Sequence, residues 1–157
     1  MVDTLKKRIA REESGFTLIE LLVVIIILGI LLAIAVPSYL SFKDRANKTA
    51  AQSDVRALVP SVESWNSDNG GTAGDVDASA STSGYQGMSV TLLKSVYDQS
   101  IDNSSNSPYA IPPTGFTNTA TDYCITATVG GWTAYKHGPD GTISVTKSSS
   151  FSGSSCQ

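Results

Sequence analysis

The chain has 157 residues, enough for one modest domain and one further element, and its formal net charge of −3 excludes the strongly basic composition typical of nucleic-acid-binding proteins. The charge is uneven, because residues 1–15 are formally +1 and the remainder is formally −4. Strong apolarity lies in residues 16–36, and the chain beyond residue 70 is rich in Ser, Thr, Gly, Asn and Asp. A basic start, an apolar middle and an acidic remainder indicate a membrane-oriented chain.

The apolar segment from Phe16 to Val36 contains a single charged residue, Glu20. As a helix it would rise about 31 Å, close to the thickness of the hydrocarbon core of a bilayer. Because the Lys and Arg residues precede it, the positive-inside rule predicts a cytoplasmic N-terminus and an exported remainder. An ionisable group in a spanning helix costs roughly 1–3 kcal/mol, so we expect Glu20 either to have a partner or function or to reach the headgroups from the membrane edge.

The residues around Glu20 form a specific string. Residues 14–20 read Ser-Gly-Phe-Thr-Leu-Ile-Glu, after a short charged leader and directly before the apolar segment. Over roughly residues 6–45 this pattern resembles the N-terminal region of type IV pilins and pseudopilins. The resemblance implies that a membrane-embedded prepilin peptidase and methyltransferase cuts after Gly15 and methylates the new N-terminal residue, Phe16. The short leader is similar to those of the type IVa class.

Cleavage at this site would create a charged partner for Glu20. The new α-amine of Phe16 has a reference pKa near 8 and is cationic at neutral pH. In a filament whose core is a bundle of these helices, both charges would be buried, and buried charges are tolerated when they are paired. We therefore expect Glu20 of one subunit to pair with the Phe16 amine of a neighbour and to fix the axial register.

Two other targeting segments are alternatives for the same region. A secretory signal peptide would use Ala33-Ile34-Ala35 as its cleavage site, but the apolar run is too long and Glu20 interrupts it. A plain signal anchor explains the orientation and leaves the string at residues 14–20 unexplained.

Beyond the apolar segment we expect an amphipathic helix over residues 38–66. Gly29 and Pro37 are expected to interrupt the first helix, because proline lacks a backbone N–H. Pro37 either marks the membrane exit or, as the resemblance implies, lies in a stretch that melts in the assembled filament. Pro60 predicts a break or bend near residues 57–59, so that the second helix would be in two pieces. The apolar stripe that should pack on a sheet includes Val55, Leu58, Val62 and Trp65, with Trp65 in the core.

The second half of the chain predicts loops, a short element and strands. Residues 68–87 indicate a long surface loop, matching the variable loop of pilins by resemblance. Asp68, Asp75 and Asp77 raise the question of a calcium site, but the EF-hand pattern is absent and a solvated acidic loop is the preferred interpretation. Residues 90–97 suggest a short helix or strand, and residues 102–113 a loop.

Three β-rich runs joined by strong turn residues predict an antiparallel meander at residues 123–129, 132–136 and 142–146. With the N-terminal helix they predict an α+β fold of pilin type. In this fold a long helix, half membrane-spanning and half amphipathic, packs on a C-terminal antiparallel β-sheet.

The two cysteines, Cys124 and Cys156, both lie in the exported part, where an even count favours a disulfide. The bond would close a loop of about 33 residues and stabilise the fold by roughly 3–4 kcal/mol. The pair is similar to the C-terminal disulfide of many pilins. His137 is the sole histidine, expected at an exposed strand end, and the sequence has no catalytic or metal-binding motif. We therefore expect no enzyme activity, no cofactor and no metal.

The resemblance implies four regions: a cleaved leader (1–15), a transmembrane and filament-core helix (16–37), an amphipathic helix (38–66) and a globular head (67–157). It implies a structural subunit of a type IV pilus, used in adhesion, motility or surface attachment. The expected partners are the prepilin peptidase, the pilus assembly machinery, the cytoplasmic membrane before assembly and copies of the chain in an extracellular filament. The alternatives are a minor pilin, a type II secretion pseudopilin and a DNA-uptake competence pilin, the last disfavoured by the acidic head. No nucleic acid partner is expected.

Overall fold

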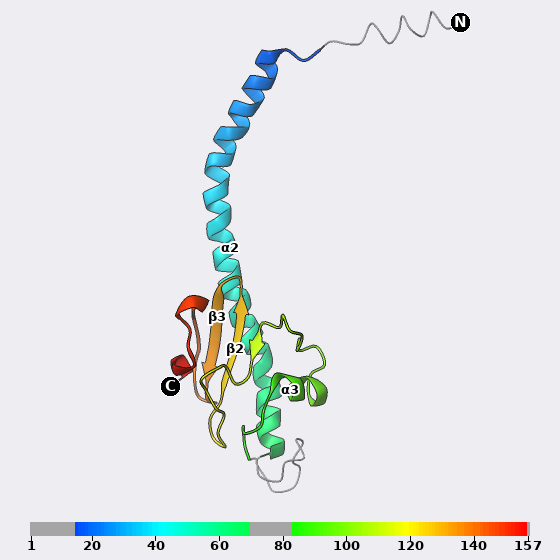
Figure 1. Ribbon diagram of the computed structural model, residues 1–157, viewed down its shortest axis with the longest axis vertical. Coiled ribbons are helices and arrows are strands. Elements are labelled where there is room, and N and C mark those ends of the chain that lie inside the picture. The colour runs from blue at the N-terminus through cyan, green and yellow to red at the C-terminus, as the bar shows by residue number, and fades with distance from the viewer. Residues whose placement is uncertain (1–14, 70–82, 157) are drawn as a thin grey trace, which may run out of the picture. The chain divides into compact units, whose positions relative to one another are not determined.

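The computed structural model describes residues 15–69 and 83–156, and the chain divides into two compact units at residues 42 and 43. Helix α2 (Leu18–Asn69) begins in the first unit and ends in the second. Helix α3 (Val90–Val96) and four strands follow in the second unit (Figure 1). The α+β architecture predicted from the sequence is confirmed.

The sheet is an antiparallel meander in the order β1-β2-β3-β4. Its strands are β1 (Tyr109–Ala110), β2 (Cys124–Val129), β3 (Trp132–His137) and β4 (Ile143–Lys147). The three predicted strands are confirmed to within a residue or so at each end, whereas β1 falls in a segment predicted to be a loop. Gly130 and Gly131 turn between β2 and β3 with φ of 55° and 84°, which L-residues with a side chain rarely adopt.

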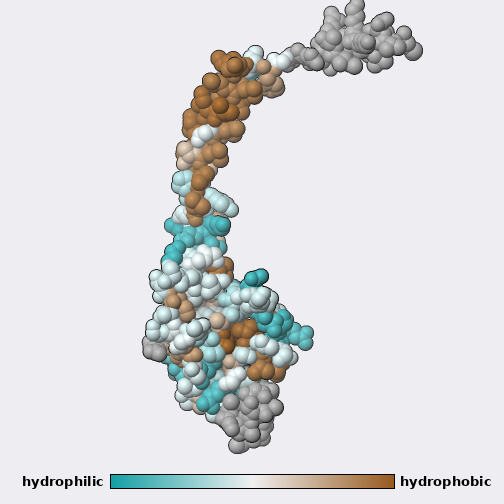
Figure 2. All heavy atoms as spheres, in the orientation of Figure 1, coloured by the Kyte–Doolittle hydropathy of each residue, from teal (hydrophilic) through white to brown (hydrophobic). Residues whose placement is uncertain are grey.

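The first unit exposes an almost unbroken apolar surface. Its part of α2 is long and apolar enough to cross a membrane, and the apolar side chains from Phe16 to Phe42 are all exposed (Figure 2). A helix that is apolar on every side needs lipid or other helices around it to be stable. The described part of this unit therefore needs lipid or neighbouring helices to cover its apolar side chains.

The second unit has its own core between α2, α3 and the sheet. One face of α2 supplies Ala51, Val55, Leu58, Val62 and Trp65, all at most 1% exposed. These residues recur at steps of three and four, so they form a single stripe along the helix. The stripe lies in one cluster with Leu93 of α3 and with Ile125, Ala127 and Ala134 of the sheet. Trp65 also meets the ring of Tyr97 edge-on at 6.4 Å, which confirms its predicted place in the core.

The predicted break at residues 57–59 is wrong. Helix α2 continues through Pro60 and also through Gly29 and Pro37, so the interruptions expected at these two residues are wrong as well. It ends at Asn69, three residues after the predicted end at residue 66. Proline at position 60 removes one backbone hydrogen bond, the one its N–H would donate to the carbonyl of Arg56. Leu58 and Val62 on either side are buried in the core, and this packing holds the helix together across the missing bond.

Replacing the exposed Pro60 by alanine is expected to stabilise the protein. Alanine restores the missing donor and is about 3 kcal/mol more favourable than proline inside a helix, while the more flexible unfolded chain returns up to about 1 kcal/mol. We expect a net gain of about 2 kcal/mol for Pro60→Ala. Thermal unfolding in detergent micelles, followed by circular dichroism, measures it, and Arg56→Ala is a control that leaves the backbone bond absent. A lower melting temperature for Pro60→Ala would mean that the structure uses the proline ring itself.

Most of the predicted surface loop lies outside the described residues. This applies to residues 70–82, and therefore to Asp75 and Asp77 of the calcium interpretation. The described remainder, residues 83–87, forms a turn whose Gly84 has φ of 62°.

Candidate processing and assembly site

The start of α2 carries a reciprocal pair of hydrogen bonds between Thr17 and Glu20. The carboxylate of Glu20 accepts from the backbone N–H of Thr17 at 2.9 Å and from the Thr17 hydroxyl at 2.6 Å. The Glu20 N–H donates back to the Thr17 hydroxyl oxygen at 3.4 Å. Thr at the N-cap and Glu three residues later form a capping box, which satisfies N–H groups that the first turn leaves free.

Glu20 thus has a local partner before any second subunit is present. The Thr-x-x-Glu spacing before an apolar run is the signal of a capping box, and Thr17 is a functional residue that was not predicted from the sequence. The carboxylate also lies in the first helical turn, where the positive end of the helix dipole favours a negative charge. The capping box therefore holds an ionised carboxylate one turn from the predicted new N-terminus.

The bond between Gly15 and Phe16 lies just outside the helix. Phe16 is 77% exposed, and both residues precede the first helical residue, Leu18. A protease binds its substrate in an extended form. An added Cβ at Gly15 would meet no atom within 4 Å, so no other part of the described chain covers this residue. The local structure suits cleavage, and the assignment of Gly15, Phe16, Glu20 and Pro37 to processing and assembly remains a prediction.

A disulfide joins Cys124 at the start of β2 to Cys156 in the final turn, with Cα atoms 6.0 Å apart. Both cysteines are fully buried. Near the bond, Gly153 lies against Thr114 and Gly115, where a Cβ would come within 2.5 Å of the Thr114 carbonyl oxygen. The disulfide and this close contact fix the Ser-rich tail onto the head.

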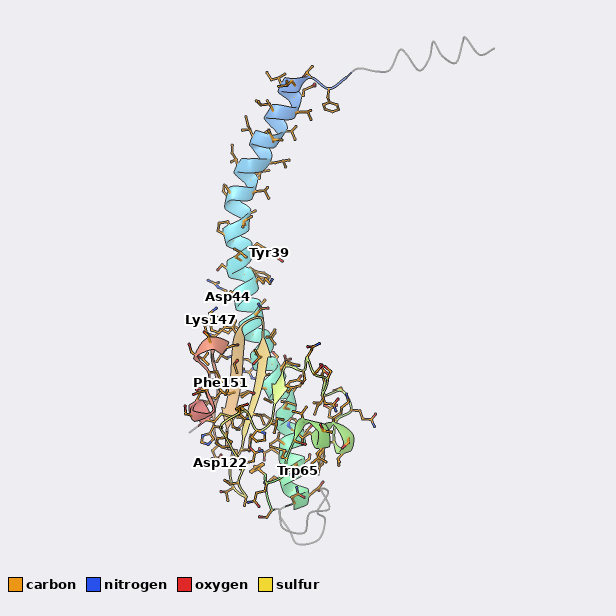
Figure 3. The ribbon with its side chains drawn as sticks, viewed as in Figure 1. Tyr39, Asp44, Trp65, Asp122, Lys147 and Phe151 are labelled. Atoms are coloured by element: carbon orange, nitrogen blue, oxygen red, sulfur yellow. A yellow bond between two sulfur atoms is a disulfide. The ribbon has the colours of Figure 1, made fainter. Side chains whose placement is uncertain are left out.

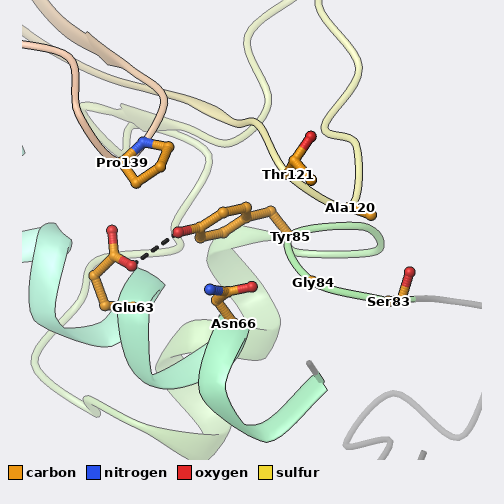
Figure 4. Close-up of a pocket in the computed structure, with 8 residues that line it drawn as sticks. All are labelled: Glu63, Asn66, Ser83, Gly84, Tyr85, Ala120, Thr121 and Pro139. Carbon is orange, nitrogen blue, oxygen red and sulfur yellow. Dashed lines mark hydrogen bonds between the residues drawn. The ribbon is translucent and has the colours of Figure 1, made fainter. Parts of the chain in front are cut away.

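A shallow pocket on the second unit lies around Glu63, at the end of α2 (Figure 4). The Glu63 carboxylate accepts a hydrogen bond from the hydroxyl of Tyr85 at 2.8 Å and another from Tyr123 at 3.1 Å. The two phenol rings lie 4.5 Å apart. Since each carboxylate oxygen already has a partner, we interpret this group as a structural clamp between α2, the 83–87 turn and the residue that precedes β2.

The hydrogen bonds from Tyr85 and Tyr123 to Glu63 predict that the protein becomes less stable at alkaline pH. Burial, together with the nearby Glu63 carboxylate, raises the pKa of Tyr85 and of Tyr123 above the ordinary phenol value. Below the unfolded value of about 10 their stabilising contribution is complete, and it is lost as the pH rises towards the folded values, because the unfolded chain releases these protons first. We expect the melting temperature to fall from about pH 10 upward, and to fall less steeply in Tyr85→Phe. Tyr39→Phe, at an exposed tyrosine, is the control, and equal slopes for all three proteins would contradict the prediction.

His137 lies at the end of β3, as expected, and its Nε2 is 2.6 Å from a carboxylate oxygen of Asp122. The ring of Phe116 packs edge-on against it at 5.7 Å. Among residues 15–69 and 83–156, no group of three or more His, Cys, Asp or Glu side chains is placed to hold a metal ion.

Comparison with known proteins gives matches to the N-terminal part of the chain. Residues 10–36 match the family model described as the prokaryotic N-terminal methylation motif. The chain is 46% identical over 59 residues to the type II secretion system core protein G of Pseudomonas aeruginosa, covering 38% of this chain and 42% of that protein. It is 48% identical over 54 residues to a fimbrial protein of Pseudomonas aeruginosa, covering 34% of this chain and 35% of that protein.

The similarity to these relatives covers less than half of the chain. The chain matches about two fifths of the length of the secretion proteins, with the Aeromonas hydrophila core protein G 44% identical over 59 residues and covered to 41%. No solved structure matches the chain. The family model covers residues 10–36, and most of the chain lies outside every one of these matches.

Proposed function

We propose that this chain, whose N-terminal segment is that of a type IV pilin or pseudopilin, is the precursor of a filament subunit. Residues 1–15 are a leader that the prepilin peptidase removes after Gly15, and the new N-terminal Phe16 is methylated. Residues 16–37 form the membrane anchor and later the filament core, and the remainder forms the amphipathic helix and the exported head. The observation that carries the proposal is that the apolar part of the helix is exposed along its length and begins with a capping box that contains the Glu20 carboxylate.

The apolar helix supports both stages of this function. All its apolar side chains are exposed, and in the bilayer they contact lipid. In a filament the same side chains contact neighbouring helices, so assembly exchanges lipid contacts for helix–helix contacts. Such an exchange has little hydrophobic driving force, because lipid tails are as apolar as leucine. Specific polar contacts must therefore set the register.

Glu20 supplies that contact. After cleavage, the Phe16 amine of one subunit and the Glu20 carboxylate of the next are opposite charges in an apolar bundle, where an unpaired charge is costly. Pairing neutralises both and fixes the stagger between subunits. Because α2 runs through Pro37 as a regular helix, melting at this position would accompany assembly, when neighbouring subunits change its surroundings.

The expected partners are the prepilin peptidase, the assembly machinery and further copies of the chain. The precursor would lie in the cytoplasmic membrane with its head outside, and the assembled form in an extracellular filament. The acidic head gives no reason to expect nucleic acid as a partner. A pilus subunit, a minor pilin and a type II secretion pseudopilin share the processing by the peptidase, the membrane-anchored precursor and the assembly with other subunits, and they differ in where the assembled form lies.

The similarity to the core protein G makes the pseudopilin a specific second candidate. Sheared surface filaments separate the two, because a pilus subunit is abundant in them at native expression and a pseudopilin remains with the envelope. The buried disulfide and the polar head support the pilus subunit as the first candidate.

The decisive experiment is the intact mass and N-terminal residue of the protein from sheared filaments and from membranes. We expect a chain that begins at methylated Phe16, lighter by the hydrogens lost in forming the Cys124–Cys156 bond. A secreted chain beginning at Val36 would overturn the proposal, as would an uncut chain confined to membranes.

A further inference from the structure

The end of the sheet brings a tryptophan and a lysine onto the start of the head's helix. The indole N–H of Trp132 donates to the Asp44 carboxylate at 2.8 Å. The ammonium of Lys147 lies 3.1 Å from the same oxygen (Figure 3). Lys147 lies 3.9 Å and Lys48 5.4 Å from the centre of the Trp132 ring. Hydrogen bonds from Trp132 and Lys147 also hold the pKa of Asp44 below its usual range. Residues far apart in sequence thus form one ordered cluster.

This cluster belongs to a larger set of positive charges, which we name the basic collar: Lys43, Arg45, Lys48 and Lys147, all exposed. Asp44 is the acidic residue among them, so the collar region is formally +3. The rest of the second unit carries 3 basic and 9 acidic residues, a formal −6. The head is therefore strongly polarised, with most of its positive charge where α2 enters it.

The collar's helical members are spread over more than half of the circumference of α2. At about 100° per residue, Arg45 lies about 160° from Lys43 in one direction around the axis, and Lys48 lies on the opposite arc, about 140° from Lys43 and about 60° from Arg45, near Trp132. One protein partner docking on one face would meet only part of this set. A layer that surrounds the helix on all sides would contact every residue of the collar.

The position of the collar along the chain identifies such a layer. Lys43 follows the exposed Phe42 and comes seven residues after Val36, where the apolar segment ends. Seven helical residues rise about 10 Å, so the backbone of Lys43 lies just outside the polar headgroup region, which is about 5–8 Å deep on each side of the hydrocarbon core, and its long side chain can reach back to the phosphate groups. Tyr39 and Phe42 lie within this interval, at the level where aromatic side chains gather at membrane interfaces.

We propose that the basic collar binds the phosphate groups of anionic phospholipids in the outer leaflet of the cytoplasmic membrane while the subunit is anchored there. The inference rests on the proposed function, because it requires the apolar segment to lie in a bilayer. Trp132 and Asp44 act as positioning residues that hold Lys147 beside the helix, so the folded sheet completes the collar. The net negative charge of the rest of the second unit is repelled by an anionic membrane, so the collar is the part of the unit that the membrane attracts.

The test uses the full-length chain in phosphatidylcholine vesicles with a small fraction of nitroxide-labelled lipid. The readout is quenching of Trp132 fluorescence; Trp65 lies about 30 Å further along the helix, too far from the lipid to be quenched directly. We expect labelled phosphatidylglycerol to quench about threefold more than labelled phosphatidylcholine, because cations near the surface attract anionic lipid. High salt should reduce this preference, as it screens charges at the surface.

A matched pair of variants localises the effect. Lys43→Gln/Arg45→Gln removes two collar charges that do not contact Trp132, and Arg56→Gln/Lys94→Gln removes two charges from elsewhere on the head. We expect the first pair to bring the quenching ratio close to one and the second to leave it unchanged. Equal quenching by both lipids in the unmodified protein would overturn the proposal. So would loss of filaments by the collar variant with unchanged lipid preference, because the collar would then be a contact between copies of the chain. Cleavage after Gly15, measured by intact mass on the protein from cells that express the prepilin peptidase, reports separately whether the proposed function holds.

Discussion

A chain carrying Glu20→Gln is expected to insert into the membrane and lose its leader normally, and to yield at least about tenfold fewer filaments than the unmodified protein. Glutamine still occupies the third position of the capping box and can accept from the Thr17 N–H, so the helix start is preserved. The negative charge is lost, and the Phe16 amine of the neighbouring subunit would be buried without a partner. Leaving one member of a buried pair unpaired costs about 3–5 kcal/mol at each contact, and a filament repeats the contact at every subunit.

The reciprocal variant separates the charge from the cap. Thr17→Ala removes the hydroxyl that donates to Glu20 at 2.6 Å and leaves the carboxylate in place. If the charge is what assembly requires, Thr17→Ala forms filaments and Glu20→Gln does not. The opposite result, filaments with Glu20→Gln and none with Thr17→Ala, would assign Glu20 to capping alone and remove the charge pair from the mechanism. Sheared-fraction yield and intact mass of the membrane-bound form measure assembly and processing separately.

Features that depend on nearby residues could be predicted from the sequence. The apolar segment, the stripe ending at Trp65 and the three long strands follow from periodicity and from glycine-containing turns such as Gly130-Gly131. The Thr17–Glu20 capping box also depends only on nearby residues. It was not predicted, because the family resemblance already implied a role for Glu20. A family resemblance can give a residue one role, here the intermolecular pair of Glu20, while the same side chain also makes a contact within its own chain.

Features that depend on tertiary contacts could not be predicted. Strand β1 has two residues, and it is a strand only because Tyr109 and Ala110 pair with β2. Helix α2 continues through Pro60 because Leu58 and Val62 are buried on a sheet formed much later in the chain. The Asp44–Trp132 hydrogen bond joins residues 88 apart, and it exists only in the register that the meander adopts. Helix propensity correctly identifies Pro60 as unfavourable within a helix, and tertiary packing determines that the helix continues through it.

Removing the disulfide is expected to destabilise the head strongly. The bond closes a loop with a sequence separation of 32, for which loop-closure entropy predicts a loss of about 3–4 kcal/mol when both cysteines are replaced by alanine. For a head of this size the loss corresponds to a fall in melting temperature of roughly 10–20 °C. Reduction of the unmodified protein should produce a similar fall, because it opens the same loop without changing the sequence.

The tail has a second attachment, and a further variant distinguishes the two. At Gly153 an added Cβ would come within 2.5 Å of the Thr114 carbonyl oxygen and 2.6 Å of the Gly115 carbonyl carbon, so Gly153→Ala must push the tail away from its docking site while the disulfide remains. If the covalent loop supplies most of the stability, Gly153→Ala lowers the melting temperature less than Cys124→Ala/Cys156→Ala does. If the alanine pair melts within a few degrees of the unmodified protein and Gly153→Ala does not, close packing of the tail holds the head together and the bond adds little. The first result is the one we expect, because the Ser-rich segment between Lys147 and Cys156 buries little apolar surface of its own.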